Sequence, residues 1–360
     1  MKILCVIDSL CSGGAQRQMV ELAKGFKERG NEVILLTYHS INFFKPELDD
    51  FEIPVINIIE PNYLKRLFKI RKEIRSQNPD AVLSFQEVAN FIATFSSFPT
   101  RKWRLIVGER SANPTIKKSF KKIIFRWFHV FSDIVVSNSH ANIAIVRQVA
   151  PFLKKDKCRV IYNTIDFRKW ESLNTQNDSS KQFYLVIVGR YHNVKNADGL
   201  IKAISLLPEN KKKQILVHWY GEKVIPEYFN HLNKLIKKFK LTQTVFLMES
   251  QQNIKQKYKE ADYVGLFSHY EGFPNTICEA MAMRKPVIVT KISDLPLLLK
   301  DSKNGFFCDS YDVESIKNAI VKAMTTSTEE RYKFGEANYK VAQEHFDKKK
   351  IISQYLKILS

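Results

Sequence analysis

Two glutamates give the strongest chemical signal in this sequence. Glu271 and Glu279 stand at the ends of the segment EGFPNTICE, with seven residues between them. The apolar run 263–267 before this segment is typical of a buried parallel strand, and apolar residues at helical spacing follow it. The segment is therefore expected at the carboxyl end of a strand and the start of a helix, where open α/β sheets bind ligands. Two carboxylates there can accept hydrogen bonds from hydroxyls on both sides of a diphosphate, such as a ribose and a hexose.

The same residues also have a purely structural interpretation. Thr276 and Glu279 have the spacing of a capping box, in which two side chains satisfy backbone donors at a helix start. The preceding Gly-Phe-Pro-Asn is ordinary turn sequence. The two glutamates by themselves leave both interpretations open.

Two basic residues follow the strand expected at 184–188. Arg190 comes directly after Gly189, and Lys195 lies further along the same loop. At the carboxyl end of a strand, a guanidinium and an ammonium group can hold a diphosphate and stabilise the charge that grows on it as a sugar leaves. They can do so without a metal ion. A solvated basic loop is the alternative, because the chain contains 57 lysines and arginines.

A pair of glycines near the N-terminus is a weaker signal. Gly13 and Gly14 follow the apolar run 3–7 and precede a helical pattern, so their backbone can approach a phosphate closely. Paired glycines often only turn a chain. The five cysteines include no C-x-x-C pair and the eight histidines no H-E-x-x-H motif. We therefore expect no metal site and reduced thiols, as in the cytosol.

The elements that must position these residues form two series. Short apolar runs alternate with amphipathic segments up to residue 166, and the pattern restarts after a polar stretch at 168–182. Such alternation predicts parallel sheets covered by helices, and two series predict two domains. We expect an α/β protein with two Rossmann-like, doubly wound domains facing a cleft. Their expected ranges are 1–166 and 167–345, followed by a short amphipathic helix at 346–360 that returns to the first domain.

The chain is strongly basic, with a formal net charge of +20. This charge favours anionic partners: nucleic acid, an anionic membrane surface or phosphate-bearing substrates. Nucleic acid is not expected as a partner, because no C₂H₂ finger, RNP-like aromatic strand or leucine zipper is present. No stretch approaches the ~18 apolar residues that cross a bilayer. Membrane contact would therefore be peripheral.

Segment 116–131 is the candidate for that contact. Basic side chains surround a predicted apolar stripe made of Ile116, Phe120, Ile123, Ile124, Trp127, Phe128 and Phe131. The basic residues are Lys117, Lys118, Lys121, Lys122 and Arg126. An aromatic, basic, amphipathic helix can lie in an anionic lipid interface, where each basic group contributes roughly 1 kcal/mol. We predict this contact, and a core-facing helix with a solvated basic face is the alternative.

Considered together, the motifs resemble those of glycosyltransferase family 4. The resemblance spans nearly the whole chain and rests on the E-x7-E element at 271–279, Gly189-Arg190 with Lys195-Asn196, Tyr220-Gly221-Glu222, Ile161-Tyr162-Asn163 with Asp166, and Gly13-Gly14. It implies the GT-B fold and retaining transfer of a sugar, without a metal ion or other cofactor. The motifs are specific for the superfamily and not for a substrate.

The resemblance also implies roles for individual residues. The catalytic groups would be Glu271 on the donor sugar, with Arg190 and Lys195 on the diphosphate. Glu279 would bind the ribose, and backbone at Gly14, Asn275 and Thr276 would complete the nucleotide-sugar site. A front-face route is implied, in which the leaving phosphate deprotonates the acceptor.

The sequence departs from the family pattern at several positions. Gln16 stands where many relatives have a glutamate, and Arg284 where glycine is usual. Many members place a histidine after the fourth strand of the first domain. This chain has Glu109 and Arg110 there, which we interpret as candidate acceptor or sugar contacts.

The predicted function is a retaining glycosyltransferase with a nucleotide-sugar donor, expected to be UDP-linked. The predicted acceptor is a glycan or polyprenyl-diphosphate-linked saccharide in surface polysaccharide synthesis. We expect the protein in the cytoplasm, peripheral at the inner face of the cell membrane. The alternatives are a same-fold nucleotide-sugar epimerase, a glycogen-type synthase, or a non-catalytic basic protein that binds polyanions.

Overall fold

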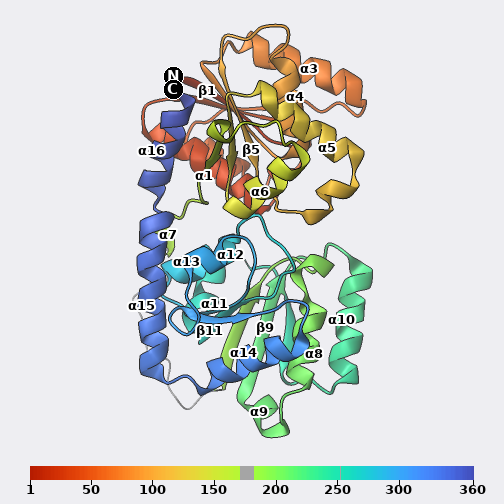
Figure 1. Ribbon diagram of the computed structural model, residues 1–360, viewed down its shortest axis with the longest axis vertical. Coiled ribbons are helices and arrows are strands. Elements are labelled where there is room, and N and C mark those ends of the chain that lie inside the picture. Colours follow the sequence, from red (N-terminus) through yellow and green to blue (C-terminus); the bar gives the residue numbers. More distant parts are fainter. Residues whose placement is uncertain (171–181, 252) are drawn as a thin grey trace. The chain divides into compact units, whose positions relative to one another are not determined.

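The computed structural model describes residues 1–170, 182–251 and 253–360 (Figure 1). The chain forms two compact units, one of Met1–Thr164 with Phe346–Ser360 and the other of Ile165–His345. The division differs from the expected boundary at residue 166 by two residues. Each unit has its own parallel sheet with helices packed on it.

The first unit contains a seven-stranded parallel sheet in the order β3-β2-β1-β4-β5-β6-β7. Its strands are β1 (Lys2–Val6), β2 (Glu32–Thr37), β3 (Val55–Asn57), β4 (Ala81–Phe85), β5 (Arg104–Glu109), β6 (Ile134–Ser137) and β7 (Cys158–Val160). Its helices include α1 (Gly14–Glu28), α2 (Lys45–Asp49), α3 (Tyr63–Ser76), α4 (Glu87–Ser96), α6 (His140–Val149), η3 (Lys155–Lys157) and α16 (Lys348–Leu359). The strand order reverses between β1 and β4. The carboxyl ends of these two strands therefore flank a topological switch point, where open sheets bind ligands.

Two apolar clusters cover the two faces of this sheet. One includes residues of α1 and α16, and the other includes residues of α3, α4 and α6. The final helix, α16, buries Ile351, Ile352, Tyr355 and Leu359. A Cβ atom at Gly25 of α1 would lie 2.3 Å from Ile352 Cδ1. This glycine in the last turn of α1 therefore permits the close approach of α16.

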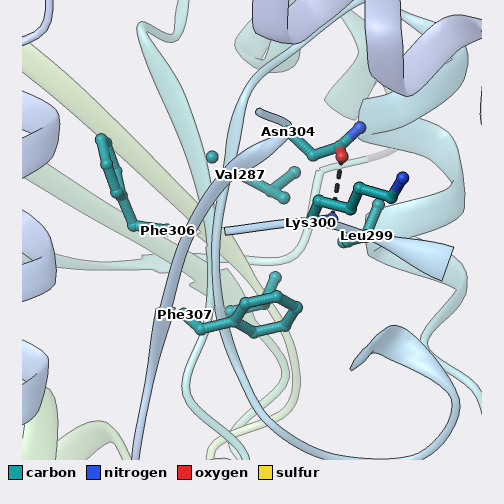
Figure 2. Close-up of a pocket in the computed structure, with 8 residues that line it drawn as sticks. Val287, Leu299, Lys300, Asn304, Phe306 and Phe307 are labelled. Carbon is teal, nitrogen blue, oxygen red and sulfur yellow. Dashed lines mark hydrogen bonds between the residues drawn. The ribbon is translucent and has the colours of Figure 1, made fainter. Parts of the chain in front are cut away.

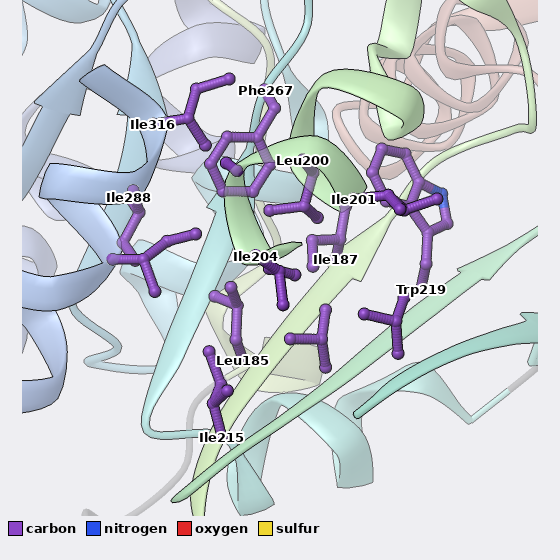
Figure 3. Close-up of a cluster of buried hydrophobic side chains, with 14 of the residues drawn as sticks. Leu185, Ile187, Leu200, Ile201, Ile204, Ile215, Trp219, Phe267, Ile288 and Ile316 are labelled. Atoms are coloured by element: carbon purple, nitrogen blue, oxygen red, sulfur yellow. The ribbon is translucent and has the colours of Figure 1, made fainter. Parts of the chain in front are cut away.

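The second unit contains a six-stranded parallel sheet in the order β10-β9-β8-β11-β12-β13. Its strands are β8 (Phe183–Val188), β9 (Ile215–Gly221), β10 (Val245–Glu249), β11 (Tyr263–Leu266), β12 (Val287–Thr290) and β13 (Gly305–Cys308). Its helices are α7 (Phe167–Trp170), η4 (Asn193–Lys195), α8 (Ala197–Ser205), α9 (Glu209–Gln214), α10 (Pro226–Lys238), α11 (Ile254–Glu260), α12 (Asn275–Ala282), α13 (Leu295–Leu298), α14 (Val313–Thr325) and α15 (Thr328–His345) within the described residues. Figure 3 shows part of its core, where Leu185 and Ile187 of β8 lie near Leu200, Ile201 and Ile204 of α8. In this sheet the strand order reverses between β8 and β11.

Segment 116–131 does not form the single helix predicted from its sequence. The chain divides at this point into η1 (Pro114–Lys118), α5 (Phe120–Trp127) and η2 (Phe128–Phe131), with extended backbone at Ser119. These breaks shift the helical phase, so the buried residues are Ile116, Phe125, Arg126 and His129. Three members of the predicted stripe, Phe120, Trp127 and Phe131, are instead 71%, 40% and 46% exposed. The prediction of one continuous stripe is therefore wrong, and aromatic side chains lie on the surface.

Candidate active site

The loop between β11 and α12 carries the E-x7-E segment. The helix α12 begins at Asn275, and its N-cap residue is Pro274, which makes no side-chain cap hydrogen bond. Thr276 therefore lies inside the first turn of the helix and is not its cap. The capping-box explanation of the spacing requires Thr276 at the N-cap, so the structure does not support it.

Glu271 is in direct contact with Lys195. Lys195 Nζ lies 2.5 Å from Glu271 Oε1, and Ser268 Oγ donates a hydrogen bond to the same oxygen at 2.8 Å. Lys195 ends the short turn η4 after β8, whereas Glu271 follows β11. These two strands flank the switch point of the second sheet. The fold thus brings together two predicted catalytic residues that are 76 positions apart in the sequence.

A left-handed residue fixes the loop that carries Lys195. Asn196 has φ 60° and ψ 41°, and its side chain donates to Phe267 O at 3.2 Å and to Ser310 O at 2.7 Å. It therefore joins the loops after β8, β11 and β13. In the sequence Asn196 is only the residue after Lys195 in a family motif, because its bridging contacts depend on the strand order.

Two hydroxyls, one at the end of β12 and one in the loop after it, support the Glu271 loop. Thr290 Oγ1 donates to Ser268 O at 2.8 Å, and Ser293 Oγ donates to Gly272 O at 2.6 Å. These bonds hold the backbone on both sides of Glu271. Sequence reasoning missed Ser268, Thr290 and Ser293, because short polar residues after strands occur throughout the chain.

Arg190 lies exposed on a fixed turn at the same edge of the sheet. Its neighbour Tyr191 is buried, and the Tyr191 hydroxyl lies 2.6 Å from Trp219 O and 2.7 Å from Met248 O. A Cβ atom at Gly221 would lie 2.1 Å from Gly189 O, so glycine is required where the ends of β8 and β9 approach. The guanidinium therefore extends from a rigid support into solvent.

The predicted nucleotide contacts of the second unit all lie on α12. Asn275 and Thr276 are half-buried in its first turn. Glu279 is 2% exposed, and the Tyr258 hydroxyl donates to its Oε2 at 3.3 Å. The Tyr258 ring in turn contacts Trp170 of α7, with ring centroids 6.0 Å apart. Gly14, the remaining predicted contact, is the first residue of α1 in the first unit, so its place in the same site stays a prediction.

Glu109 belongs to a buried cluster of charged residues. Arg126 Nη2 donates to its Oε2 at 3.0 Å, and His129 Nε2 lies 2.8 Å from its Oε1. Arg126 also pairs with Glu87 at 2.9 Å. Burial raises the pKa of a carboxyl group, but Arg126 and His129 outweigh it and lower the pKa of Glu109 to about 2. Both carboxylate oxygens are occupied by α5 and η2, which favours a structural role over the predicted sugar contact.

Arg110 is held by residues of three other elements. Its guanidinium carbon lies 3.6 Å from the centroid of the Phe85 ring, and its nitrogens donate to the Tyr355 hydroxyl and, at 3.3 Å, to Asn163 Oδ1. Arg110 therefore connects the carboxyl ends of β4 and β7 to α16. Its role as an acceptor contact stays a prediction.

A shallow apolar pocket lies away from these residues. Figure 2 shows it beside Val287, Leu299 and Phe306, at the amino ends of β12 and β13. Open sheets bind ligands at the carboxyl ends of their strands, so this pocket is not the candidate site. Across the ranges that the structure describes, no group of three or more His, Cys, Asp or Glu side chains has the arrangement of a metal site. No helix in the same ranges combines the length and the apolar character needed to span a membrane.

Two family models match consecutive parts of the chain. Glycosyltransferase Family 4 matches residues 12–169, and Glycosyl transferases group 1 matches residues 168–341. This chain belongs to glycosyltransferase family 4. The identity that the motifs implied is thereby confirmed, and with it the prediction that the protein is a glycosyltransferase.

Several relatives and solved structures are similar to this glycosyltransferase over nearly its full length. One relative is the N-acetylgalactosamine-N,N'-diacetylbacillosaminyl-diphospho-undecaprenol 4-alpha-N-acetylgalactosaminyltransferase of Campylobacter jejuni, 25% identical over 374 residues that cover 99% of each chain. Another is the amylovoran biosynthesis glycosyltransferase AmsD of Erwinia amylovora, 24% identical with 93% of each chain covered. The crystal structure of Anabaena HepE in complex with UDP and glucose has a TM-score of 0.87 at 20% identity and covers 100% of this chain and 99% of that one. Together with the two parallel sheets, this likeness confirms the predicted GT-B fold.

Proposed function

We propose that this glycosyltransferase transfers a sugar from a UDP-linked donor, with retention, to a polyprenyl-diphosphate-linked saccharide in surface polysaccharide synthesis. The contact between Lys195 and Glu271 at the switch point of the second sheet is the observation that carries the proposal. The names of the Campylobacter and Erwinia relatives support the acceptor and the process. The UDP in the Anabaena structure supports the donor nucleotide.

The two charged groups have complementary tasks in this proposal. Glu271 accepts hydrogen bonds from donor-sugar hydroxyls, and Lys195 compensates charge on the diphosphate as the glycosidic bond breaks. In the structure they satisfy each other, with 24% and 17% of their side chains exposed, so both groups are accessible to a donor. Arg190 adds a second cation at the same edge. No metal ion or other cofactor is needed for this compensation.

One experiment separates this function from the alternatives. The purified protein is incubated with UDP-glucose, UDP-galactose and the corresponding UDP-N-acetylhexosamines. Each donor is tested without an acceptor, with farnesyl-diphosphate-linked N-acetylgalactosamine and with a glucan, and products are analysed by mass spectrometry. A transferase adds one sugar to the acceptor. An epimerase converts the donor without an acceptor, and a glycogen-type synthase extends only a glucan. A polyanion-binding protein turns over nothing, and its affinity for a polyanion survives Glu271→Gln.

We also propose peripheral contact with the inner face of the cell membrane. Phe120, Trp127 and Phe152, which together form the aromatic patch, are 71%, 40% and 51% exposed. The Trp127 ring contacts the other two, with centroids 6.4 and 6.2 Å apart. Trp127 Nε1 donates to Val149 O at 2.8 Å, which fixes the ring at the surface.

Exposed basic residues lie close in sequence to the aromatic patch, on both of its chain segments. Lys117, Lys118 and Lys121 are exposed in η1 and α5, and Lys154 and Lys155 are exposed beside Phe152. Aromatic rings that insert at the headgroup level, with lysines that meet anionic lipids, form a peripheral membrane site. This surface replaces the continuous stripe expected from the sequence, and Phe152 is a member that the helical pattern did not identify.

A further inference from the structure

The first unit holds a carboxylate at its own switch point. Asp8 follows β1 through Ile7, and its carbonyl oxygen accepts from the backbone N–H groups of Tyr38 and His39 at 3.0 Å each. Its Oδ1 accepts from the Ser9 N–H at 2.6 Å and from Gln16 Nε2 at 2.8 Å. Asp8 is half-buried, so it is both fixed in position and accessible.

A strained glutamine after the adjacent strand completes this arrangement. Gln86 follows β4 with φ 79° and ψ 156°, a region that residues other than glycine rarely adopt. With its amide oriented to satisfy its partners, Gln86 Nε2 donates to Asp8 Oδ2 and Oδ1 at 2.8 and 3.0 Å, and its Oε1 accepts from Gln16 Nε2 at 2.8 Å. Strain of this kind persists where the surrounding structure enforces it, and it concentrates at binding sites.

The position of the Asp8 carboxylate and its remaining capacity to accept a hydrogen bond indicate a ligand-binding role. The strand order reverses between β1 and β4, so Asp8 and Gln86 flank the point where doubly wound sheets bind substrates. Each oxygen of a carboxylate can accept two hydrogen bonds. Asp8 Oδ2 accepts from Gln86 and can accept one more, from a hydroxyl. The second unit shows the same plan, with Lys195 and Glu271 at its switch point.

We propose that Asp8 binds a hydroxyl of the acceptor saccharide and that Gln16 and Gln86 are its positioning residues. This inference rests on the proposed glycosyltransferase reaction. Apart from backbone at Gly14, the groups predicted for the donor belong to the second unit. We therefore assign the side chains at the switch point of the first unit to the other substrate. The hydroxyl donates to Asp8 Oδ2, and the two amides keep the carboxylate in the orientation that receives it.

Three variants test the assignment. Asp8→Asn removes the charge and keeps the shape. Gln86→Gly removes the amide and also relieves the positive φ, so it should fold at least as well as the natural protein. The control is Asp80→Asn, because Asp80 accepts from the Lys2 N–H at 2.7 Å at the opposite edge of the same sheet.

The measurements separate acceptor binding from donor binding and from folding. Transfer rates are measured at a series of concentrations of farnesyl-diphosphate-linked N-acetylgalactosamine, and donor hydrolysis is measured without this acceptor. Calorimetry gives the affinity for UDP, and thermal unfolding gives the stability of each variant. Asp8→Asn should lower kcat/KM for the acceptor about tenfold or more through a raised KM, because a hydrogen bond to a charged group is lost. Gln86→Gly should act in the same direction, while UDP affinity and donor hydrolysis stay unchanged in both.

Two results would overturn the proposal. Unchanged acceptor kinetics in Asp8→Asn and Gln86→Gly would show that the network only fixes the loop. Parallel loss of UDP affinity and acceptor use, or an equal effect of Asp80→Asn, would show a general structural role. If the natural protein neither binds UDP nor hydrolyses a UDP-sugar, the proposed reaction itself fails, and this inference fails with it.

Discussion

At the scale of single residues, Glu271 and Lys195 form an ion pair. A donor bound to both groups would have to break this pair. In the structure the ammonium group of Lys195 lies 2.5 Å from Glu271 Oε1, so each charge compensates the other. A UDP-sugar offers hydroxyls to the carboxylate and a diphosphate to the ammonium. In the proposed reaction the same two residues pair with each other and also bind the donor, so each change at this site tests the donor assignment.

Glu271→Gln and Glu279→Gln should each weaken catalysis while the fold survives. In the proposed site each change removes charge-assisted hydrogen bonds to substrate hydroxyls, worth roughly 1.5–3 kcal/mol per lost interaction, and keeps the side-chain shape. The measurement is kcat/KM for the donor together with thermal unfolding. Glu329→Gln is the matched control, because Glu329 is exposed on α15 and pairs only with Lys333 among the contacts described for it. Near-normal turnover in both site variants would contradict the assignment of this segment.

Arg190→Ala should lower the transfer rate on the order of 10²-fold, because it removes one of the two cations that we propose stabilise the leaving diphosphate. Chelation with EDTA should leave the rate of the natural protein unimpaired. The two assays are run on the same preparation, with magnesium and manganese added back. Activity that disappears in EDTA and returns with either metal would show that a metal ion, and not Arg190 with Lys195, compensates the charge on the diphosphate.

At the scale of elements, the buried cluster of Glu109, Arg126 and His129 fastens α5 and η2 to the end of β5. Glu109→Gln should destabilise the first unit by about 3–5 kcal/mol, because it removes one partner of a buried ion pair. The pKa of Glu109 is about 2, below its ordinary value of 4.5. Its stabilising contribution is therefore complete above about pH 4.5 and is lost as the pH falls through about 2.

Chemical denaturation at a series of pH values checks this prediction. The stability difference between the natural protein and Glu109→Gln should be largest at neutral pH and should shrink between about pH 4.5 and 2. If the difference in unfolding free energy between the two proteins is small at pH 7, or independent of pH, the structural role proposed for Glu109 is wrong. Glu329→Gln again serves as the exposed control, with an expected effect below about 0.5 kcal/mol.

The aromatic patch leads to a prediction about lipid binding. Replacing Lys117, Lys118, Lys121 and Lys122 by glutamate should reduce co-sedimentation with anionic liposomes sharply but not completely, because the aromatic rings still insert. Raising the salt from about 0.1 M to about 1 M shortens the screening length from roughly 10 Å to roughly 3 Å, so binding of the natural protein should weaken too. Trp127→Ala with Phe152→Ala should reduce the binding that persists at high salt.

A control with equal charge separates this surface from the general basicity of the chain. Lys234, Lys237, Lys238 and Lys240 lie on and after α10 in the second unit. Their replacement by glutamate changes the net charge by the same amount as the first set. If both sets of substitutions reduce liposome binding equally, total charge explains the effect and the aromatic patch does not. Equal binding of the natural protein to anionic and neutral liposomes would also contradict the prediction.

At the scale of the whole molecule, much of the fold follows from apolar runs. The sequence predicts the central strands of both sheets, because each is a short buried run between helical segments. It does not predict β3 and β13, which are edge strands of three and four residues. β3 has only Val55 and Ile56 before a polar residue, and β13 begins with glycine, so neither stands out as a continuous apolar run. The loops with Glu271 and Lys195 are predicted, whereas Asp8, Gln86 and Ser268 gain their meaning only from strand order, which no local pattern encodes.

The packing of α16 has a consequence for how the protein is made. The core of the first unit combines residues that precede and follow the second unit in the sequence. The centroid of the Tyr355 ring lies 6.3 Å from that of Phe26 and 6.4 Å from that of Phe85. On a ribosome, the second unit is synthesised before α16, so the first unit emerges early but completes its core last. We expect a chain lacking residues 347–360 to keep a cooperative transition for the second unit and to bind a dye for exposed apolar surface through the first. A nonsense mutation before α16 would thus act on the domain that is made first.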